Sequence, residues 1–226
     1  MPFVFAPPEQ AAIPVLDEHY EFFPIHRVYG IAKNYREPGS TEQPTPFYFM
    51  KANDNVVPVA EGRTVEISLP SYSQDLRHEI ELVACLGRGG RDLTLEEAHE
   101  AVWGWCVGID FTLADAALPS GARDFLVGKS FDRSAPVSHV RPAYRTPLPA
   151  PVDLWLYVNN QKRQSGTTAN LIRSPYEQIV ELSRRFTLAP GDIIFTGTPA
   201  GASRLLAGDL IEAGVNGVGS LKVKIV

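Results

Sequence analysis

Two glutamates separated by one residue carry the most chemical information in this sequence. Glu79 and Glu81 lie in the segment 78–83, which reads His-Glu-Ile-Glu-Leu-Val. Side chains alternate between the faces of an extended strand, so both carboxylates would project from the same face. The apolar neighbours predict a buried strand, and two buried carboxylates repel each other unless a proton or a cation neutralises them. Oxygen ligands favour a hard divalent cation, magnesium first and then manganese or calcium. The alternative to a metal site is an edge strand whose outer face carries the two charges.

Three further segments could add groups to such a site. Asp110 follows the apolar stretch 103–109, where a carboxylate is either a third oxygen ligand or a cap for the next loop. Lys129 is flanked by glycine and serine, and it either stabilises charge developing on a substrate oxygen or extends along the surface. The segment 195–201, Phe-Thr-Gly-Thr-Pro-Ala-Gly, could direct backbone N–H groups and the Thr198 hydroxyl at an anion, or form an ordinary turn.

Composition and charge exclude several classes of protein. A chain of 226 residues can form one sizeable core, and 44% hydrophobic with 21% charged residues is ordinary for a globular protein. A formal net charge of -5 provides no basic surface for nucleic acid. The N-terminus has no positively charged leader and no apolar run is long enough for a membrane span, so we expect a cytoplasmic protein that contacts no membrane. Cys85 and Cys106 are expected to be buried reduced thiols.

Local patterns predict many strands and few helices. Capping boxes at Thr94 and Ser174 predict helices over 94–102 and 174–186. Asn-Asn at 159–160 and Asn-Gly at 216–217 predict two-residue hairpin turns, because these residues tolerate positive φ. Strands are expected at 27–32, 47–51, 154–158, 161–164, 210–215 and 218–226. This content favours an α+β, β-rich architecture of curled, mixed sheets.

Taken together, these motifs resemble the fumarylacetoacetate hydrolase family, in particular its small members of the fumarylpyruvate hydrolase and acylpyruvase type. The resemblance extends from about Arg27 to Val226 and rests on several motifs in the same order, at 78–82, 108–110, 128–132, 164–168, 190–201 and 216–217. It implies a mixed β-sandwich roll with a few short helices. It also implies an N-terminal extension, 1–25, that packs on a single catalytic domain, 26–226, and a homodimer.

The same resemblance implies a site and an activity. Magnesium, or alternatively manganese or calcium, would be held by Glu79, Glu81 and Asp110. The conserved lysine of the family falls on Lys129, and the implied substrate contacts are Lys33, Tyr35, Gly197 and Thr198. The implied activity is hydrolysis of a carbon–carbon bond in a small 2,4-dioxo acid through a metal-stabilised enolate, a reaction type used in aromatic catabolism.

The sequence departs from the family pattern at five positions around this site. Pro38 and Thr41 stand where hydrolytic members carry the histidine and glutamate that activate water. Ala114 and Ala117 replace an arginine and a glutamine that follow the third metal ligand. Lys33 replaces an arginine, which keeps the positive charge but loses bidentate carboxylate recognition.

Without that dyad, the identity of the general base is open. Glu37 and Glu42 are the nearest substitutes, and the alternative is that both are solvated loop charges. No histidine is assigned a catalytic role, and His78 is expected to face away from the glutamates. Two other functions therefore stay open beside hydrolysis. One is decarboxylation or tautomerisation of a 2-oxo acid, which needs no attacking water, and the other is binding of a metal and a dicarboxylate without turnover.

Overall fold

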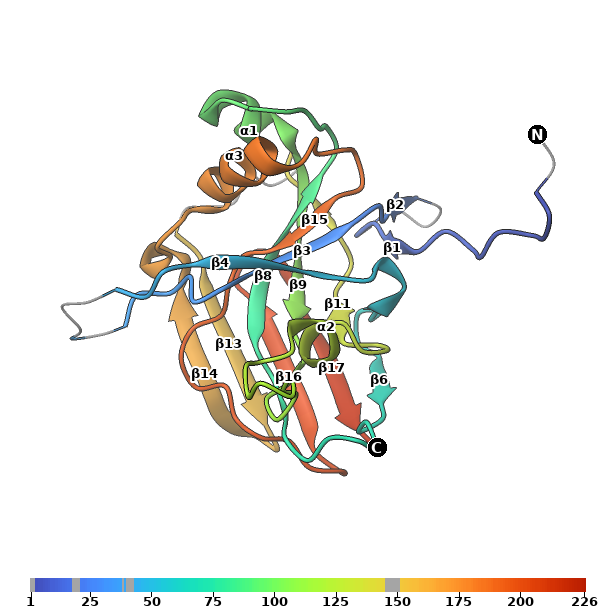
Figure 1. Ribbon diagram of the computed structural model, residues 1–226, viewed down its shortest axis with the longest axis vertical. Coiled ribbons are helices and arrows are strands. Elements are labelled where there is room, and N and C mark those ends of the chain that lie inside the picture. The colour runs from blue at the N-terminus through green and yellow to red at the C-terminus, as the bar shows by residue number, and fades with distance from the viewer. Residues whose placement is uncertain (1–2, 18–20, 38, 40–42, 145–150) are drawn as a thin grey trace.

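Two packed β-sheets form the body of the protein (Figure 1). The computed structural model describes residues 3–17, 21–37, 39, 43–144 and 151–226. The larger sheet has the strand order β4-β3-β15-β8-β9-β11-β5, with β12 paired to β9. Its strands are β3 (Val28–Ala32), β4 (Phe47–Lys51), β5 (Val56–Pro58), β8 (Ile80–Leu86), β9 (Val102–Ile109), β11 (Ala135–Val137), β12 (Arg141–Pro142) and β15 (Ile193–Phe195). The β15–β3 and β11–β5 pairs are parallel and the others are antiparallel, so the sheet is mixed.

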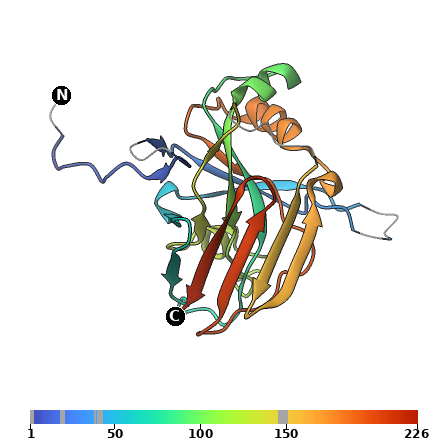
Figure 2. The ribbon, with the colours of Figure 1, turned by 180° about the vertical axis from the view of Figure 1, so that it is seen from behind.

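The smaller sheet covers one face of the larger one (Figure 2). Its order is β14-β13-β16-β17-β6, built from β6 (Thr64–Ile67), β13 (Asp153–Val158), β14 (Gln161–Thr167), β16 (Leu210–Val215) and β17 (Gly219–Ile225). The main core lies between the sheets, where Ile80 and Leu82 of β8 join Leu156 of β13 and Val223 of β17 in one buried cluster. The predicted β-rich sandwich is therefore confirmed, with both inner faces closed to water.

A short N-terminal hairpin lies against the opposite face of the larger sheet. Its strands are β1 (Ala12–Pro14) and β2 (Phe22–Pro24). The side chains of Ile13 and Phe23 join a second buried cluster that includes Val83, Cys85 and Cys106. The two cysteines are free, buried thiols with 3.9 Å between their sulfur atoms. The larger sheet is thus buried on both faces, as its nearly continuous apolar strands require.

Capping chemistry explains the two longer helices. Helices α1 (Leu95–Ala101) and α3 (Pro175–Arg185) each begin after a complete capping box, at Thr94 and Ser174 as predicted, and they contact each other at one end of the sheets (Figure 1). The sequence patterns did not predict helix α2 (Phe125–Lys129), whose N-terminus is capped by the Asp124 carboxylate through the Val127 amide at 3.0 Å. The remaining short elements are η1 (Asn53–Asn55), β7 (Leu76–Arg77), β10 (Thr112–Leu113) and η2 (Thr168–Asn170).

Both predicted hairpins are present, but the second has a three-residue loop, 216–218, in place of the predicted two-residue turn, because Val215 pairs with Gly219. Asn159 and Asn160 have φ values of 51° and 62°, the left-handed conformation that a two-residue primed turn needs, and Gly217 has φ 76°. In β17 the side chains of residues 221, 223 and 225 are buried and those of 222 and 224 are exposed. Of the helices in the described parts of the chain, none is both long and apolar enough to cross a membrane.

Candidate active site

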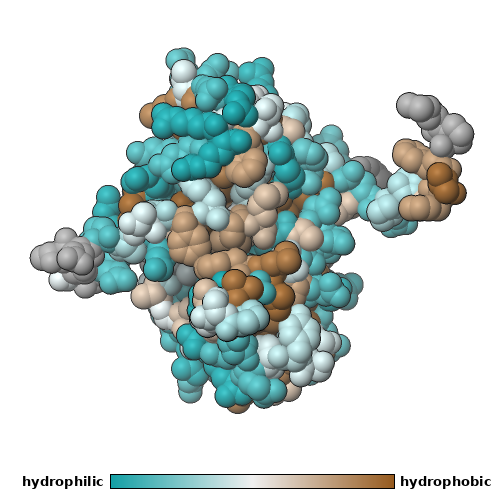
Figure 3. Space-filling view, viewed as in Figure 1, coloured by the Kyte–Doolittle hydropathy of each residue, from teal (hydrophilic) through white to brown (hydrophobic). Residues whose placement is uncertain are grey.

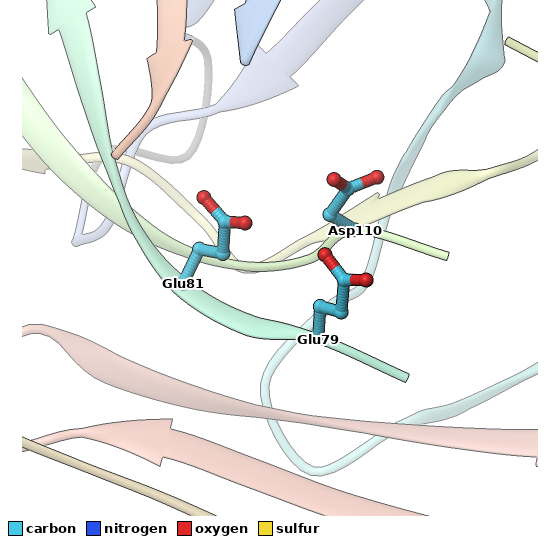
Figure 4. A group of neighbouring side chains, drawn as sticks. All are labelled: Glu79, Glu81 and Asp110. Carbon is cyan, nitrogen blue, oxygen red and sulfur yellow. The ribbon is translucent and has the colours of Figure 1, made fainter. Parts of the chain in front are cut away.

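Three carboxylates converge beside the larger sheet (Figure 4). One oxygen each from Glu79, Glu81 and Asp110 can be chosen so that all lie within 4.8 Å of one another. Glu81 lies in β8 opposite Gly108 of β9, and the backbone N–H of Asp110 donates to the Glu79 carbonyl at 2.8 Å. The antiparallel ladder therefore holds all three, although β8 begins at Ile80 and Glu79 directly precedes it. We call these residues the carboxylate triad.

Two buried lysines face the triad. Lys129 Nζ donates to Glu79 Oε2 at 2.8 Å and to Asp110 Oδ2 at 2.6 Å, so it is not the surface lysine of the alternative prediction. Lys51 Nζ lies 2.8 Å from Asp110 Oδ1. Burial lowers the pKa of an ammonium, but Asp110 and Glu79 outweigh that effect and raise the pKa of Lys129. At Lys51 the effect of burial prevails and the pKa lies below its usual value.

Sequence reasoning missed Lys51 and Thr112. Lys51 also donates to the Ser134 hydroxyl at 3.0 Å and to the Lys129 carbonyl. Its signal was its place on the buried face of β4, two residues after Phe49. The Thr112 hydroxyl accepts from Lys129 Nζ at 2.6 Å and donates to Glu79 Oε1 at 2.9 Å, so it fixes both groups. No pattern around Thr112 indicated that role.

Glu81 lies in an unfavourable environment for a charged carboxylate. It is buried, and burial together with Asp110 and Glu79 raises its pKa well above the usual range, although the Gly197 N–H opposes this through a 2.6 Å hydrogen bond. A cation among the three oxygens would relieve that repulsion. An all-carboxylate donor set is one that a hard divalent cation prefers, so the residues present fit such an ion.

Gln164 connects β8 to the loop that follows β15. Its Oε1 accepts from the Ile80 amide at 3.1 Å and lies 2.9 Å from His78 Nδ1, while its Nε2 donates to Thr198 Oγ1 at 2.9 Å and to the Pro199 carbonyl at 2.8 Å. Because Oε1 is only an acceptor, His78 Nδ1 carries the proton. Burial lowers the pKa of His78, which keeps the imidazole neutral. His78 thus faces away from the triad, as expected, and helps to orient the 197–199 loop.

A second polar connection holds the Asn34-Tyr35 segment. Asn34 Nδ2 donates to the carbonyls of Thr196 at 2.8 Å and Arg173 at 2.9 Å, and Asn34 Oδ1 accepts from the Arg173 amide at 2.8 Å. The Tyr35 hydroxyl is buried and makes no hydrogen bond within the described residues. Burial, with a further effect of Glu81, raises the pKa of Tyr35. The tyrosine therefore offers a neutral hydroxyl group beside the triad.

A cleft of about 420 Å³ is lined by Glu79 and Lys129, whereas the buried Glu81 and Asp110 do not line it. Six of the residues predicted from sequence line the cleft: Lys33, Tyr35, Glu37, Glu79, Lys129 and Thr198. Gly197 is not among the lining residues, and its N–H donates to Glu81. The cleft is lined by Ile31, Ala32, Lys33, Tyr35, Arg36, Glu37, Pro44, Glu79, Arg123, Phe125, Lys129, Thr198, Pro199, Ala200, Gly201 and Ala202.

Of the two residues predicted as a general base, the structure describes Glu37 but not Glu42. Glu37 is exposed at the cleft, and no hydrogen bond or ion pair within the described residues fixes its carboxylate. Glu42, like Pro38 and Thr41, lies outside the described residues. The structure therefore brings one of the two substitutes to the cleft.

Volume alone does not locate the chemistry. A hollow of about 750 Å³ beside α2 is lined mainly by apolar groups, including the exposed Leu126 and Val127, with Asp132 and Arg133 as its charged residues. Figure 3 shows apolar surface near α2 in the middle of the face in view. The smaller cleft is the one lined by a carboxylate of the triad, Glu79, together with Lys129 and the polar side chains of Tyr35 and Thr198.

Comparison with known proteins identifies the family. Residues 27–226 match the family described as Fumarylacetoacetate (FAA) hydrolase C-terminal. The chain belongs to the fumarylacetoacetate hydrolase family. The predicted resemblance is thus confirmed over the whole region that carries the triad and the cleft.

Family members of known structure share the fold closely. A fumarylpyruvate hydrolase from Pseudomonas aeruginosa, solved with Mn²⁺ and pyruvate, superposes with a TM-score of 0.92 at 38% identity and covers 100% of this chain and 99% of its own. A 5-carboxymethyl-2-hydroxymuconate delta-isomerase from Mycobacterium smegmatis gives a TM-score of 0.80 at 29% identity, covering 96% of this chain and 82% of its own. The Mn²⁺ in the first relative and the triad in this chain together indicate a divalent-metal site.

A third relative has another named activity. The mitochondrial oxaloacetate tautomerase FAHD1 of Rattus norvegicus is 35% identical over 201 residues, which are 86% of this chain and 89% of the relative. Relatives named as a hydrolase, an isomerase and a tautomerase thus share one fold, and all act on small organic acids. Family membership alone does not decide among these reactions.

Proposed function

We propose that this protein is a divalent-metal-dependent hydrolase that cleaves a carbon–carbon bond in a 2,4-dioxo acid of the fumarylpyruvate or acylpyruvate type. The observation that carries the proposal is the convergence of three carboxylates with Lys129, of which Glu79 and Lys129 line an open cleft. The similarity to a fumarylpyruvate hydrolase that binds Mn²⁺ and pyruvate supports the choice of substrate class.

The carboxylate triad would hold the cation, with Mg²⁺ as the first expectation and Mn²⁺ or Ca²⁺ as alternatives. When bound, this ion would attract the carboxylate and 2-oxo group of the substrate and stabilise the negative charge that develops during cleavage. Lys129 lies against two members of the triad and would add positive charge where an oxyanion forms. Tyr35, Lys33, Gly197 and the Thr198 hydroxyl would orient the substrate in the cleft.

Hydrolysis also needs a base. Water must add to the carbonyl at carbon 4, the bond between carbons 3 and 4 must break, and carbon 3 must gain a proton to give a 2-oxo acid and a carboxylic acid. We propose Glu37 as the group that removes the proton from water, because its free carboxylate lines the cleft. Glu42 is the alternative from sequence.

A second reaction has support of its own. The similarity to an oxaloacetate tautomerase and the absence of the histidine–glutamate dyad, replaced by Pro38 and Thr41, both favour tautomerisation or decarboxylation of a 2-oxo acid. Such reactions use the same metal site and substrate contacts but require no attacking water. Glu37 would then transfer a proton to or from carbon 3.

Product analysis separates these reactions. Purified protein with Mg²⁺ or Mn²⁺ would be incubated with fumarylpyruvate, acetylpyruvate and oxaloacetate, and the products would be followed by NMR. Two acids from a dioxo acid support hydrolysis, whereas release of carbon dioxide or faster keto–enol exchange of oxaloacetate supports the second reaction. If no substrate turns over, the protein is a metal- and dicarboxylate-binding relative and the hydrolase proposal is wrong.

The family resemblance leads to three further proposals about the whole chain. We propose that it forms a homodimer, that it acts in the cytoplasm, and that residues 1–25 are an extension of a catalytic domain spanning 26–226. Light scattering of the full chain and of a chain beginning at residue 26 would test the assembly and the role of the extension. A monomeric full chain would contradict the first proposal.

A further inference from the structure

We infer that Arg123 binds a second carboxylate of the substrate, at the mouth of the cleft and away from the carboxylate triad. The inference rests on the proposed function and narrows it, because it assigns the protein a dicarboxylic substrate.

Arg123 is an available donor in the right place. Its side chain lines the same cleft as Glu79 and Lys129, and the residue is exposed. Within the described residues it makes no hydrogen bond or ion pair. Arg36 lines the cleft too, but its Nη1 donates to the carbonyls of Ala169 at 3.3 Å and Leu171 at 2.9 Å. The guanidinium of Arg123 is therefore available to bind a ligand, whereas the Arg36 guanidinium already donates to backbone carbonyls.

The backbone around Arg123 is held on both sides. Arg123 pairs with Ala117 in an antiparallel bridge that closes a short loop, and the next residue, Asp124, donates its N–H to the Ala116 carbonyl at 3.0 Å. Ala117 has no polar group that could occupy the guanidinium across the bridge. The loop thus fixes the Cα of Arg123 while its charged end stays unpaired.

Helix α2 sets the separation between the two ends of a ligand. Arg123 lies two residues before this helix, and Lys129 is its last residue. At a rise of 1.5 Å per residue, the helix from Phe125 to Lys129 alone extends about 6 Å along its axis. A substrate whose 2-oxo acid end lies at the triad would therefore reach Arg123 only with a group at its far end. A planar guanidinium prefers a carboxylate there, because the two can form paired hydrogen bonds.

The charge at the mouth of the cleft favours an anion. Lys33, Arg36 and Arg123 line it, and Glu37 is the acidic residue among the exposed side chains there. Such an excess of positive charge attracts a dianion more strongly than a monoanion. This agrees with a substrate that carries one carboxylate for the metal site and one for Arg123.

The test compares two substrates that differ in one group. Succinylpyruvate and butanoylpyruvate have acyl chains of equal length that end in a carboxylate and a methyl group. Steady-state kinetics with saturating Mg²⁺ would be measured for the natural protein, Arg123→Ala, Arg123→Lys and the control Arg91→Ala, which removes an exposed charge from another part of the surface. We expect Arg123→Ala to lower kcat/KM for succinylpyruvate by about tenfold to hundredfold, the size of one charge-assisted interaction. Butanoylpyruvate kinetics should change less than about twofold, and Arg123→Lys should restore part of the preference.

The outcomes separate this inference from the proposed function. If the natural protein cleaves both compounds without preference, or if Arg123→Ala slows both equally, hydrolysis stands and the role of Arg123 is wrong. If the protein cleaves neither, the hydrolase proposal fails, and calorimetric binding of the same two compounds to Mn²⁺-loaded protein decides about Arg123. Tighter binding of succinylpyruvate that is lost in Arg123→Ala supports the inference, and equal binding contradicts it.

Discussion

The backbone N–H of Gly197 donates a 2.6 Å hydrogen bond to Glu81 Oε2, so the loop 197–199 and the carboxylate triad share a direct contact. Gly197 has φ 107°, and a Cβ at this position would lie 2.9 Å from the Cβ of Asn34. Glycine therefore allows the loop to approach both the Asn34 segment and Glu81. A substitution that moves the Glu81 carboxylate should therefore also shift the 197–199 loop, which we propose to contact the substrate.

Glu81→Gln should weaken binding of Mn²⁺ by at least about 100-fold, because even partners behind the metal ligands typically contribute tenfold to a hundredfold. Isothermal titration calorimetry with Mn²⁺ would measure the effect, with Glu96→Gln on α1 as a control for loss of one exposed charge. Unchanged affinity in Glu81→Gln would show that the triad is not the metal site.

Lys51→Met should destabilise the protein by about 3–5 kcal/mol, because it leaves the buried Asp110 carboxylate with one cation fewer. Lys222→Met removes a lysine of the same size from an exposed ion pair with Glu212 at 3.1 Å, and it should cost less than about 1 kcal/mol. Urea denaturation of both variants gives the comparison. Equal losses would mean that Lys51 has no special role in holding Asp110.

Gln164→Leu should raise KM about tenfold while the affinity for Mn²⁺ changes little. The substitution removes both donors to the 197–199 loop and leaves buried groups without partners, each at a cost of about 1–3 kcal/mol. Kinetics and calorimetry on the same samples would separate the two effects. Gln161→Leu, at the exposed start of the same strand, is the control. A loss of metal affinity as large as the rise in KM would contradict a role confined to the loop.

Glu37→Gln should lower kcat by about 10²–10⁴ if Glu37 is the general base, with metal affinity unchanged. Glu96→Gln again controls for charge. A rate within twofold of the natural protein would exclude Glu37 and leave Glu42 or a different reaction.

We expect Glu181 to contribute to the stability of the fold in a pH-dependent manner. Burial alone would raise its pKa, but Arg173 and Tyr48, which donate to it at 2.7 and 2.9 Å, together lower the pKa below its usual value. A carboxyl with a lowered folded pKa stabilises the fold above its unfolded pKa, about 4.3, and loses that contribution as the pH falls through the folded pKa.

The free energy of unfolding should therefore differ by about 1 kcal/mol between the natural protein and Glu181→Gln at pH 7 and become smaller toward pH 3. Urea denaturation at pH 7, 5 and 3 measures this difference. Glu100→Gln, which breaks an exposed pair with Arg88, should show almost no difference at any pH. A difference for Glu181→Gln that stays constant with pH would overturn the assignment.

Local chemistry explains which parts of the fold were predictable. The capping boxes at Thr94 and Ser174 and the Asn159-Asn160 turn act within a few residues, so the sequence around them contains the whole signal. Helix α2 has only five residues and exposes Leu126, so its sequence contains no periodic apolar face that would predict a helix. Contacts from distant segments hold it instead, including the edge-to-face packing of Phe125 on Phe47.

The same distinction applies to the candidate site. Glu79, Glu81 and Asp110 stood out because charge within apolar strands is unusual and needs an explanation. Lys51 and Thr112 did not stand out, because a lysine at the end of one strand and a threonine in a two-residue strand are ordinary until the partner segments are in place. Arg123 lies in a loop without periodicity, and only the bridge to Ala117 and the cleft reveal its position.

The pairing of β8 with β9 has a consequence for folding. Glu79 directly precedes β8, Glu81 is the second residue of β8, and Asp110 directly follows β9. The Asp110 N–H donates to the Glu79 carbonyl and so joins the two strands at this point. A slip of one residue between the strands would turn the Glu81 carboxylate to the opposite face of the sheet. A divalent ion held by the triad would therefore bind only the correctly aligned chain and, at 100 times its dissociation constant, would favour that alignment by about 2.7 kcal/mol. The ion that we propose for catalysis would thus also select the strand register during folding.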